Sequence, residues 1–257
     1  MIKLIASDLD GTVLQNGAQE IEPEFFQLIL DLKKKGIHFV AASGREYDNM
    51  RNLFDPIKDE ISYVSLNGAQ YHYNGKRTIL STIEPELTQK IIRAIRAHGR
   101  CEIIYSSKYH TYVESKNDDF KNHLTNIVKN NITVVDDLLA LDEPALKIAI
   151  CDPESIDNCE SYFREIFEEY IGVRTSGNLW LDFIPLGVDK SIALQYIMNH
   201  RGVTPDECMA FGDQWNDVEM LEMMGTSFAM ANAVPGISAY STNVTDSVEK
   251  ELRKLLD

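Results

Sequence analysis

The stretch IASDLDGTVL, residues 5–14, places two aspartates directly after an apolar run. Residues 2–7 are almost continuously apolar, which is typical of a strand buried on both faces of a parallel sheet. Asp8 and Asp10 follow this run, and Gly11 and Thr12 come next. Two carboxylates so close repel each other unless a positive charge lies nearby or one of them is protonated. The stretch therefore predicts a polar site where a central strand leaves the core.

Composition limits the classes of protein to which the chain can belong. Its 257 residues are 44% hydrophobic and 25% charged, which suits one large globular domain or two smaller ones. No apolar run approaches the roughly 18 residues of a membrane span, and the N-terminal residues lack a signal-peptide pattern. The formal net charge is −15 without a basic stripe, so we expect no nucleic-acid or membrane partner; the oligomeric state is left open. The four cysteines form no CxxC pair, which predicts reduced thiols and a cytoplasmic protein.

An alternation of strands and helices surrounds the opening stretch. Residues 23–36 predict a helix, because Pro23 suits a first turn, apolar residues recur at helical spacing and Gly36 closes the end. Further strands and helices are expected to alternate at residues 37–45, 61–69, 191–202, 208–213, 218–225, 227–232 and 247–256. This pattern indicates an α/β fold with a doubly wound, mostly parallel, Rossmann-like sheet. Ligands of such sheets bind beyond the carboxyl ends of the strands, where Asp8, Ser43 and Asp213 fall.

The middle of the chain breaks this alternation. Helices are expected at residues 88–99 and 160–170, a hairpin at 101–107 and 110–115, and strands at 145–152 and 178–185. Several of these strands are candidates for antiparallel pairing. We therefore expect residues 82–185 to form an α+β domain inserted into a core made of residues 1–81 and 186–257.

Four short pieces carry residue types suited to phosphate chemistry: DLDGT (8–12), SGR (43–45), Lys190, and GDQWND (212–217). In this order, each at an expected strand or helix end, they resemble the haloacid dehalogenase (HAD) superfamily of phosphotransferases. The inserted domain is similar to the type IIB α+β cap of its Cof-type sugar-phosphatase branch, and LNGA (66–69) and MANA (230–233) also resemble that branch. The resemblance covers essentially the whole chain. It implies that the cap closes over the active site and sets substrate specificity.

The same residues suit a magnesium ion. Mg²⁺ is a hard cation that takes oxygen ligands, often carboxylates together with waters and phosphate oxygens. Asp8 and Asp213 offer carboxylates, and the resemblance implies the backbone carbonyl of Asp10 as a further ligand. Such a cation would neutralise the repulsion between the acidic groups. Asp217 is not expected to contact the cation itself. It is expected to orient Lys190 or a water bound to the cation.

The resemblance also implies catalytic roles. Asp8 is the expected nucleophile, which forms an aspartyl-phosphate, and Asp10 the acid that protonates the leaving oxygen and then activates water. Lys190 begins a predicted helix, where the helix dipole and the ammonium both favour an anion. Arg45 can either reach the substrate or form a surface salt bridge. The groups expected to hold the phosphoryl oxygens belong to Leu9, Ser43, Gly44, Lys190 and Asn216.

The function expected from the sequence is Mg²⁺-dependent hydrolysis of a small phosphorylated metabolite, with a sugar phosphate suggested by the resemblance alone. A phosphomutase shares the nucleophile, and a non-catalytic sensor of a phosphometabolite shares the binding groups, so both stay open. A dinucleotide-binding protein is disfavoured, because no GxGxxG follows the first strand. Taken alone, a DG pair is most often a turn, and Asp213, Asn216 and Asp217 suit a helix cap. Their combination with Lys190 favours catalysis.

Overall fold

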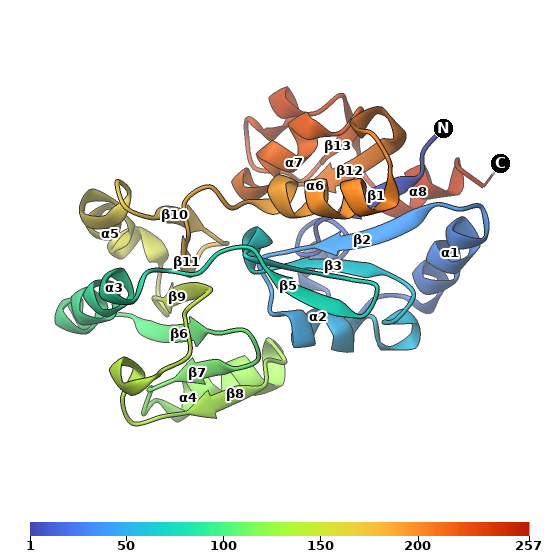
Figure 1. Ribbon diagram of the computed structural model, residues 1–257. Coiled ribbons are helices and arrows are strands. Elements are labelled where there is room, and N and C mark those ends of the chain that lie inside the picture. Colours follow the sequence, from blue (N-terminus) through green and yellow to red (C-terminus); the bar gives the residue numbers. More distant parts are fainter. Residues whose placement is uncertain (257) are drawn as a thin grey trace. The chain divides into compact units, whose positions relative to one another are not determined.

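The computed structural model describes residues 1–256 and divides into two units (Figure 1). Unit 1 comprises Met1–Thr78 and Asp189–Asp257, and unit 2 comprises Ile79–Val188. The chain thus leaves unit 1 once and returns to it once. The predicted insertion, residues 82–185, lies within unit 2, whose limits fall a few residues outside it at each end. The role of this insertion in substrate selection stays a prediction.

An eight-stranded sheet forms the centre of unit 1, in the order β14-β13-β12-β1-β2-β3-β4-β5. Neighbouring strands from β14 to β3 run parallel, and β4 pairs antiparallel with β3. All residues of β1 are buried, as its apolar run predicts for a strand in the middle of a sheet. The predicted doubly wound, mostly parallel sheet is therefore confirmed. The strands are β1 (Leu4–Ser7), β2 (His38–Ala42), β3 (Ser62–Ser65), β4 (Gln70–Tyr73), β5 (Lys76–Ile79), β12 (Cys208–Gly212), β13 (Thr226–Met230) and β14 (Asn243–Thr245).

Helices pack on this sheet through apolar side chains. The helices of unit 1 are α1 (Pro23–Lys34), α2 (Tyr47–Leu53), α6 (Lys190–Arg201), α7 (Val218–Met223) and α8 (Val248–Arg253). One core cluster joins buried side chains of α1, α2 and α8 to those of β1, β2 and β12. α1 begins with Pro23 and ends with Lys33 and Lys34, and its buried face repeats at helical spacing, so the sequence signals for this helix are confirmed. α6 and α7 contact β3, β4, β12 and β13.

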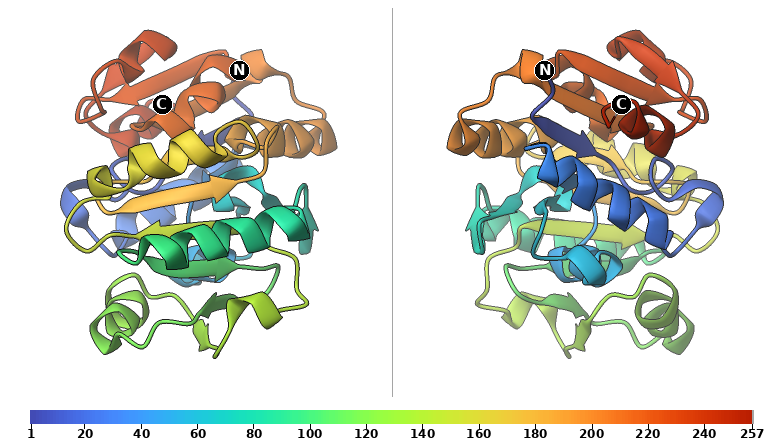
Figure 2. Two further views of the ribbon diagram at one scale, coloured as in Figure 1. Left: turned by 90° about the vertical axis from the view of Figure 1, so that its left-hand side faces the viewer. Right: turned by 90° about the vertical axis from the view of Figure 1, so that its right-hand side faces the viewer.

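Unit 2 is built on a six-stranded sheet in the order β10-β11-β9-β6-β7-β8. Its strands pair antiparallel except β7 and β8, which run parallel, and the predicted hairpin is the pair β6–β7. Figure 2 shows α3 and α5 side by side on one face of this sheet, where one cluster of buried apolar residues of unit 2 lies. The elements are α3 (Pro85–His98), β6 (Glu102–Ser106), β7 (Thr111–Val113), α4 (Asp118–Asn122), β8 (Ile132–Val134), β9 (Lys147–Cys151), α5 (Glu160–Phe167), β10 (Gly172–Thr175) and β11 (Trp180–Ile184).

One predicted strand ends earlier than expected. The apolar pattern predicts a strand over residues 61–69, but β3 ends at Ser65. Leu66, Asn67 and Gly68 all have positive φ values, of 54°, 54° and 96°. Backbone in this left-handed region cannot continue a strand. The chain therefore turns sharply at the carboxyl edge of the sheet, next to the ends of β1 and β2.

No helix within residues 1–256 is both long enough and apolar enough to cross a lipid bilayer.

Candidate active site

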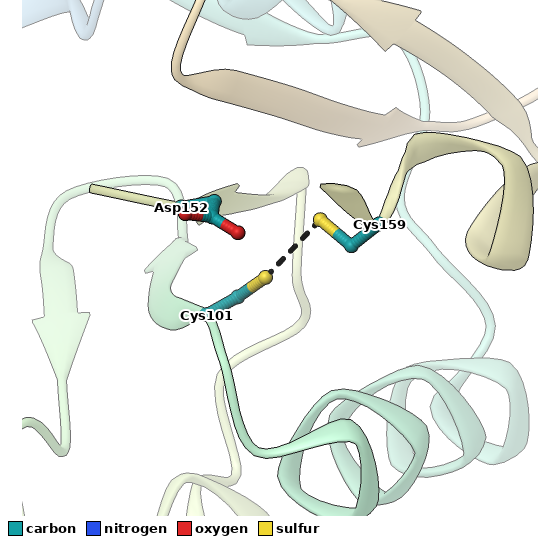
Figure 3. Close-up of side chains that lie close together, drawn as sticks. All are labelled: Cys101, Asp152 and Cys159. Atoms are coloured by element: carbon teal, nitrogen blue, oxygen red, sulfur yellow. Dashed lines mark hydrogen bonds between the residues drawn. The ribbon is translucent and has the colours of Figure 1, made fainter. Parts of the chain in front are cut away.

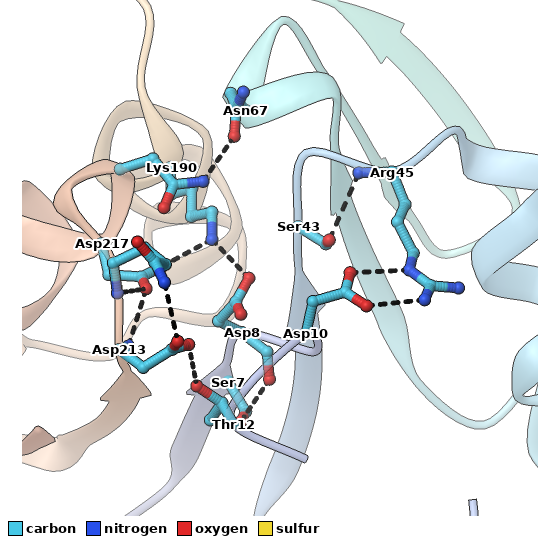
Figure 4. A network of polar contacts seen from close by, with 12 residues as sticks. Ser7, Asp8, Asp10, Thr12, Ser43, Arg45, Asn67, Lys190, Asp213 and Asp217 are labelled. Carbon is cyan, nitrogen blue, oxygen red and sulfur yellow. Dashed lines mark hydrogen bonds and ion pairs between the residues drawn. The ribbon is translucent and has the colours of Figure 1, made fainter. Parts of the chain in front are cut away.

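Asp8 lies at the end of β1 and is joined to Lys190. Its backbone N–H donates to the Phe211 carbonyl of β12 at 3.0 Å, which holds the residue at the sheet edge. The Lys190 ammonium donates to the Asp8 carboxylate at 2.6 Å. Lys190 is the first residue of α6, and Asp189 caps that helix by accepting from the Ile192 N–H. Residues far apart in the sequence thus meet through a buried ion pair (Figure 4).

The same ammonium donates to Asp217 Oδ1 at 2.5 Å. Asp217 Oδ2 accepts from the backbone N–H groups of Asp213 and Gln214, at 2.9 and 3.0 Å, so this carboxylate also caps the turn that follows β12. A Cβ at Gly212 would lie 2.5 Å from that of Asp217, so only glycine permits this approach. Lys190 and Asp217 have no exposed surface. The turn therefore holds Asp217 rigidly against the lysine.

Asp213 lies beside the opening DLDGT stretch. Thr12 Oγ donates to Asp213 Oδ1 at 2.8 Å. Gly11 has φ +84°, and a Cβ there would lie 2.2 Å from Asp213 Oδ2, so the glycine of this motif leaves room for the carboxylate. Oxygen atoms of Asp8, Asp213 and Asp217 all lie within 4.8 Å of one another. We call these three residues, together with Lys190, the acidic cluster.

The acidic cluster holds more negative charge than one ammonium can neutralise. Burial raises the pKa of Asp8 well above its usual range, and the carboxylates of Asp217 and Asp213 add to the rise against the effect of Lys190. Burial raises the pKa of Asp213 to about 6, while the Thr12 hydroxyl opposes the shift. Burial lowers the pKa of Lys190, but Asp217 and Asp8 outweigh it and raise that pKa above its ordinary value. Hard divalent cations such as Mg²⁺ prefer oxygen ligands. Closely spaced carboxylates whose negative charge is only partly neutralised suit such a cation.

The Asp10 side chain lies apart from the acidic cluster and pairs with Arg45. Arg45 Nε donates to Asp10 Oδ2 at 2.7 Å and Nη2 donates to Oδ1 at 2.6 Å, which is the two-pronged geometry of a strong ion pair. Arg45 Nη1 donates to Asn49 Oδ1 of α2 at 2.9 Å. Burial lowers the pKa of Arg45, but Asp10 outweighs it and raises that pKa. Of the two alternatives that the sequence left open for Arg45, the structure shows a salt bridge.

Three of the predicted phosphate-binding residues, Ser43, Gly44 and Asn216, lie against Asn67. Ser43 follows β2, is 2% exposed and accepts through Oγ from the Arg45 N–H at 3.2 Å. A Cβ at Gly44 would lie 3.1 Å from Asn67 Oδ1. Asn216 Nδ2 donates to that same oxygen at 2.9 Å. Asn216 therefore approaches the Ser43–Gly44 turn through Asn67, while Leu9 is fully buried at the end of β1.

Direct bonds thus unite Asp8, Lys190 and Asp217, and Asp213 lies with them. The chemical roles assigned to these residues from the sequence stay predictions. Sequence reasoning gave no role to Thr12 or Asn67, although both stand in quoted motifs, DLDGT and LNGA. The signal for Asn67 was its Asn-Gly pair, which favours positive φ values.

A second group of metal-ligand residue types lies in unit 2 (Figure 3). Cys101 Sγ and Cys159 Sγ are 3.3 Å apart, with Asp152 beside them. Burial raises the pKa of the Cys159 thiol, which disfavours the thiolate that binds metals. The Asp152 carboxylate already accepts four hydrogen bonds, from Arg100, Glu154, Ser155 and Asn158. Because the acceptor capacity of this carboxylate is used, the group stabilises unit 2 and is a poor site for a cation.

Comparisons with known proteins identify the family of the chain. A family model described as haloacid dehalogenase-like hydrolase matches residues 5–251. The chain is 29% identical over 239 residues to the 5-amino-6-(5-phospho-D-ribitylamino)uracil phosphatase of Escherichia coli, covering 93% of this chain and 88% of that protein. It is 28% identical over 249 residues to the HMP-PP phosphatase of Cronobacter sakazakii, again covering 93% of this chain and 88% of that protein.

Solved structures show the same fold. A protein of Eubacterium rectale has a TM-score of 0.86 at 27% identity and covers 99% of both chains. A protein of Thermotoga maritima has a TM-score of 0.84 at 26% identity and covers 99% of this chain and 97% of its own. The family model extends from β1 to α8 and includes every residue of the acidic cluster. The chain therefore belongs to the haloacid dehalogenase-like hydrolases.

Proposed function

We propose that the protein hydrolyses the phosphate monoester of a small metabolite in a Mg²⁺-dependent reaction that passes through phosphoryl transfer to Asp8. The observation that carries this proposal is the acidic cluster, in which one buried ammonium contacts both Asp8 and Asp217 while Asp213 lies beside them. Burying like charges is costly, so a cluster that serves stability alone would match its charges. Its excess of carboxylate suits a site that receives a cation and an anion together.

The groups that we expect to hold Mg²⁺ are the carboxylates of Asp8 and Asp213 and the backbone carbonyl of Asp10. When bound, the ion supplies positive charge that offsets the repulsion between these carboxylates and a phosphate dianion. Asp217 steadies the site by holding both Lys190 and the backbone of the turn that carries Asp213. This positioning keeps the reacting groups in place before the substrate arrives.

The remaining chemistry belongs to side chains of unit 1. A carboxylate oxygen of Asp8 attacks phosphorus, the bond from phosphorus to the leaving oxygen breaks, and Asp10 gives that oxygen a proton. Water then attacks the aspartyl-phosphate, returns a proton to Asp10, releases inorganic phosphate and restores Asp8. Lys190 and the Ser43–Gly44 turn hold the phosphoryl oxygens during both steps. Both oxygens of Asp10 accept from Arg45 in this structure, so the acid step requires one of them to leave Arg45 and take up a proton.

For the substrate we propose a small phosphorylated metabolite, with sugar phosphates to be tested first. The names of the two relatives specify phosphatases of a phosphorylated ribityl compound and of HMP-PP, so phosphorylated ribityl compounds form the second group to test. We assign substrate selection to unit 2, as the family resemblance implies. The four cysteines are free thiols, which supports the cytoplasm as the compartment.

The experiment is hydrolysis of p-nitrophenyl phosphate by the purified protein, with Mg²⁺ and then with excess chelator, followed by a panel of phosphorylated metabolites. We expect release of inorganic phosphate that stops when the cation is removed. Full activity in chelator would contradict the metal assignment. An isomerised product without phosphate release would identify a phosphomutase, and binding of a metabolite without turnover would identify a sensor.

A further inference from the structure

The loop Leu66–Gly68, which follows β3, lies against two of the chemistry-bearing segments. The Leu66 N–H donates to the Arg45 carbonyl and the Asn67 N–H donates to the Ser43 carbonyl, both at 3.1 Å. On the other side, a Cβ at Gly68 would lie 2.0 Å from the carbonyl oxygen of Asp189, the N-cap residue of α6. The loop therefore packs between the SGR turn and the start of α6, the helix that carries Lys190.

The backbone of this loop is strained. Leu66 and Asn67 both have φ 54°, a left-handed conformation that L-residues other than Asn and Asp rarely adopt. Leu66 is also fully buried, so its environment enforces the conformation. Strain of this kind persists where the surrounding structure imposes it, and it is concentrated at functional sites. Asn16 and Asn74 also have positive φ values, but they lie in exposed turns away from this site.

The Asn67 side chain reaches a third segment. Its Oδ1 accepts from Asn216 Nδ2 at 2.9 Å and lies 3.1 Å from the position of a Cβ at Gly44. Asn67 is 2% exposed. Asn216 Oδ1 is buried and has no hydrogen-bond partner among the described residues. Buried acceptors are almost always paired, so with its oxygen unpaired this amide is oriented by the bond of its nitrogen to Asn67.

We propose that Asn67 is a positioning residue, which holds the amide of Asn216 against the Ser43–Gly44 turn so that donors from separate segments meet one phosphoryl group. This inference rests on the proposed phosphatase function. It extends that function to a residue that lies in none of the four pieces DLDGT, SGR, Lys190 and GDQWND. The Asn216 amide nitrogen carries two hydrogens, of which one goes to Asn67 and the second is assigned to a phosphoryl oxygen. Without Asn67 the amide rotates away from that direction, and the site loses its alignment.

The test compares Asn67→Gly, Asn216→Ala, the double variant and the control Asn74→Gly in p-nitrophenyl phosphate hydrolysis. Glycine accepts positive φ at no steric cost, so Asn67→Gly removes the side chain and keeps the backbone. Asn74 is a matched control, because it has φ 49°, is exposed and lies in the turn between β4 and β5. We expect Asn67→Gly to lower kcat/KM by about 10-fold or more with little change in melting temperature, and Asn74→Gly to match the wild type.

The double variant separates positioning from a general structural role. If Asn67 acts through Asn216, the double variant is no slower than Asn216→Ala alone, because residues that act as one unit are not additive. Losses that multiply, or full activity of Asn67→Gly, would overturn the inference.

A second readout does not require turnover. Inorganic phosphate with Mg²⁺ should raise the melting temperature of the wild type and of Asn74→Gly, and this rise should be lost in Asn67→Gly. A wild type that shows the rise but no hydrolysis would refute the proposed function, and the melting temperatures of the wild type, Asn67→Gly and Asn74→Gly would still test Asn67. A rise retained in full by Asn67→Gly would overturn the inference whether or not the wild type turns over. A wild type with neither hydrolysis nor the rise would overturn both proposals.

Discussion

The two units bury charge in different ways. In unit 1, the ammonium of Lys190 contacts the carboxylates of Asp8 and Asp217, and that of Asp213 lies beside them. In unit 2, the carboxylate of Asp152 is fully buried but accepts four hydrogen bonds, one of them from the guanidinium of Arg100. Burial accordingly raises the pKa of Asp8, whereas the donors around Asp152 outweigh burial and lower the pKa of that group. A buried carboxylate whose hydrogen bonds are all satisfied stabilises the fold. A buried carboxylate whose charge is only partly neutralised lowers stability, which indicates that it is kept for a function.

The largest expected effect is on turnover. Asp8→Asn keeps the shape of the side chain but removes the nucleophilic oxygen charge, so hydrolysis of p-nitrophenyl phosphate should fall on the order of 10³-fold or more. Asp152→Asn makes the same chemical change in unit 2 and should leave kcat within about twofold, an estimate that rests on the structural role of this carboxylate. Steady-state kinetics of the two variants measures both. Comparable losses in the two proteins would show that the contrast between the units is unrelated to catalysis.

For the free energy of unfolding, the order of the two variants should be reversed: Asp152→Asn should lose stability and Asp8→Asn should not. Asp152→Asn places an amide nitrogen among hydrogen-bond donors, and the free energy of unfolding should fall by about 2–3 kcal/mol. Asp8→Asn removes a buried charge that its surroundings disfavour, so without divalent cations its free energy of unfolding should not fall below that of the wild type. Denaturant titration of each protein gives both values. A stable Asp152→Asn variant would indicate that its four hydrogen bonds contribute nothing.

A third prediction concerns a half-buried group of unit 1 that is held neutral. Burial lowers the pKa of His38 from 6.5 to about 3, and its Nε2 lies 2.8 Å from Ser62 Oγ. The unfolded chain binds a proton near pH 6.5 and the folded chain does not, so stability present above pH 6.5 is lost as the pH falls towards 3. At pH 5 the loss should be about 2 kcal/mol. Denaturant titrations at pH 7.5 and pH 5 should show a smaller loss in His38→Gln than in the wild type, and an equal loss would contradict the assignment.

Much of unit 1 follows from local sequence. The apolar run before Asp8, the end signals of α1 and the strand–helix alternation predict the parallel sheet, because burial on both faces requires continuous apolar strands. Unlike these, the short elements β8, β10 and β14 and the helix α2 have no clear apolar periodicity. Their formation depends on neighbours that are distant in the sequence, which a local pattern does not reveal.

The site was predictable where motifs place charged groups at strand and helix ends, as for Asp8, Lys190 and Asp213. The pairing of Arg45 with Asp10 and the contact of Asn67 with Asn216 were not, because each depends on side-chain directions set by separate segments. A sequence shows which residue types are present near an edge, and the packing of segments decides which of them touch. The early end of β3 is a similar case, since apolar residues continue past the point where the backbone turns.

The most direct test of the unbalanced acidic cluster is calorimetric titration of Mg²⁺ into the wild type, Asp213→Asn and Asp152→Asn, without substrate. We predict one Mg²⁺ site in the wild type and in Asp152→Asn, and an affinity about 10-fold or more weaker in Asp213→Asn. Equal Mg²⁺ affinity in all three proteins, or no binding by the wild type, would show that the buried carboxylates of unit 1 are not a binding site for Mg²⁺.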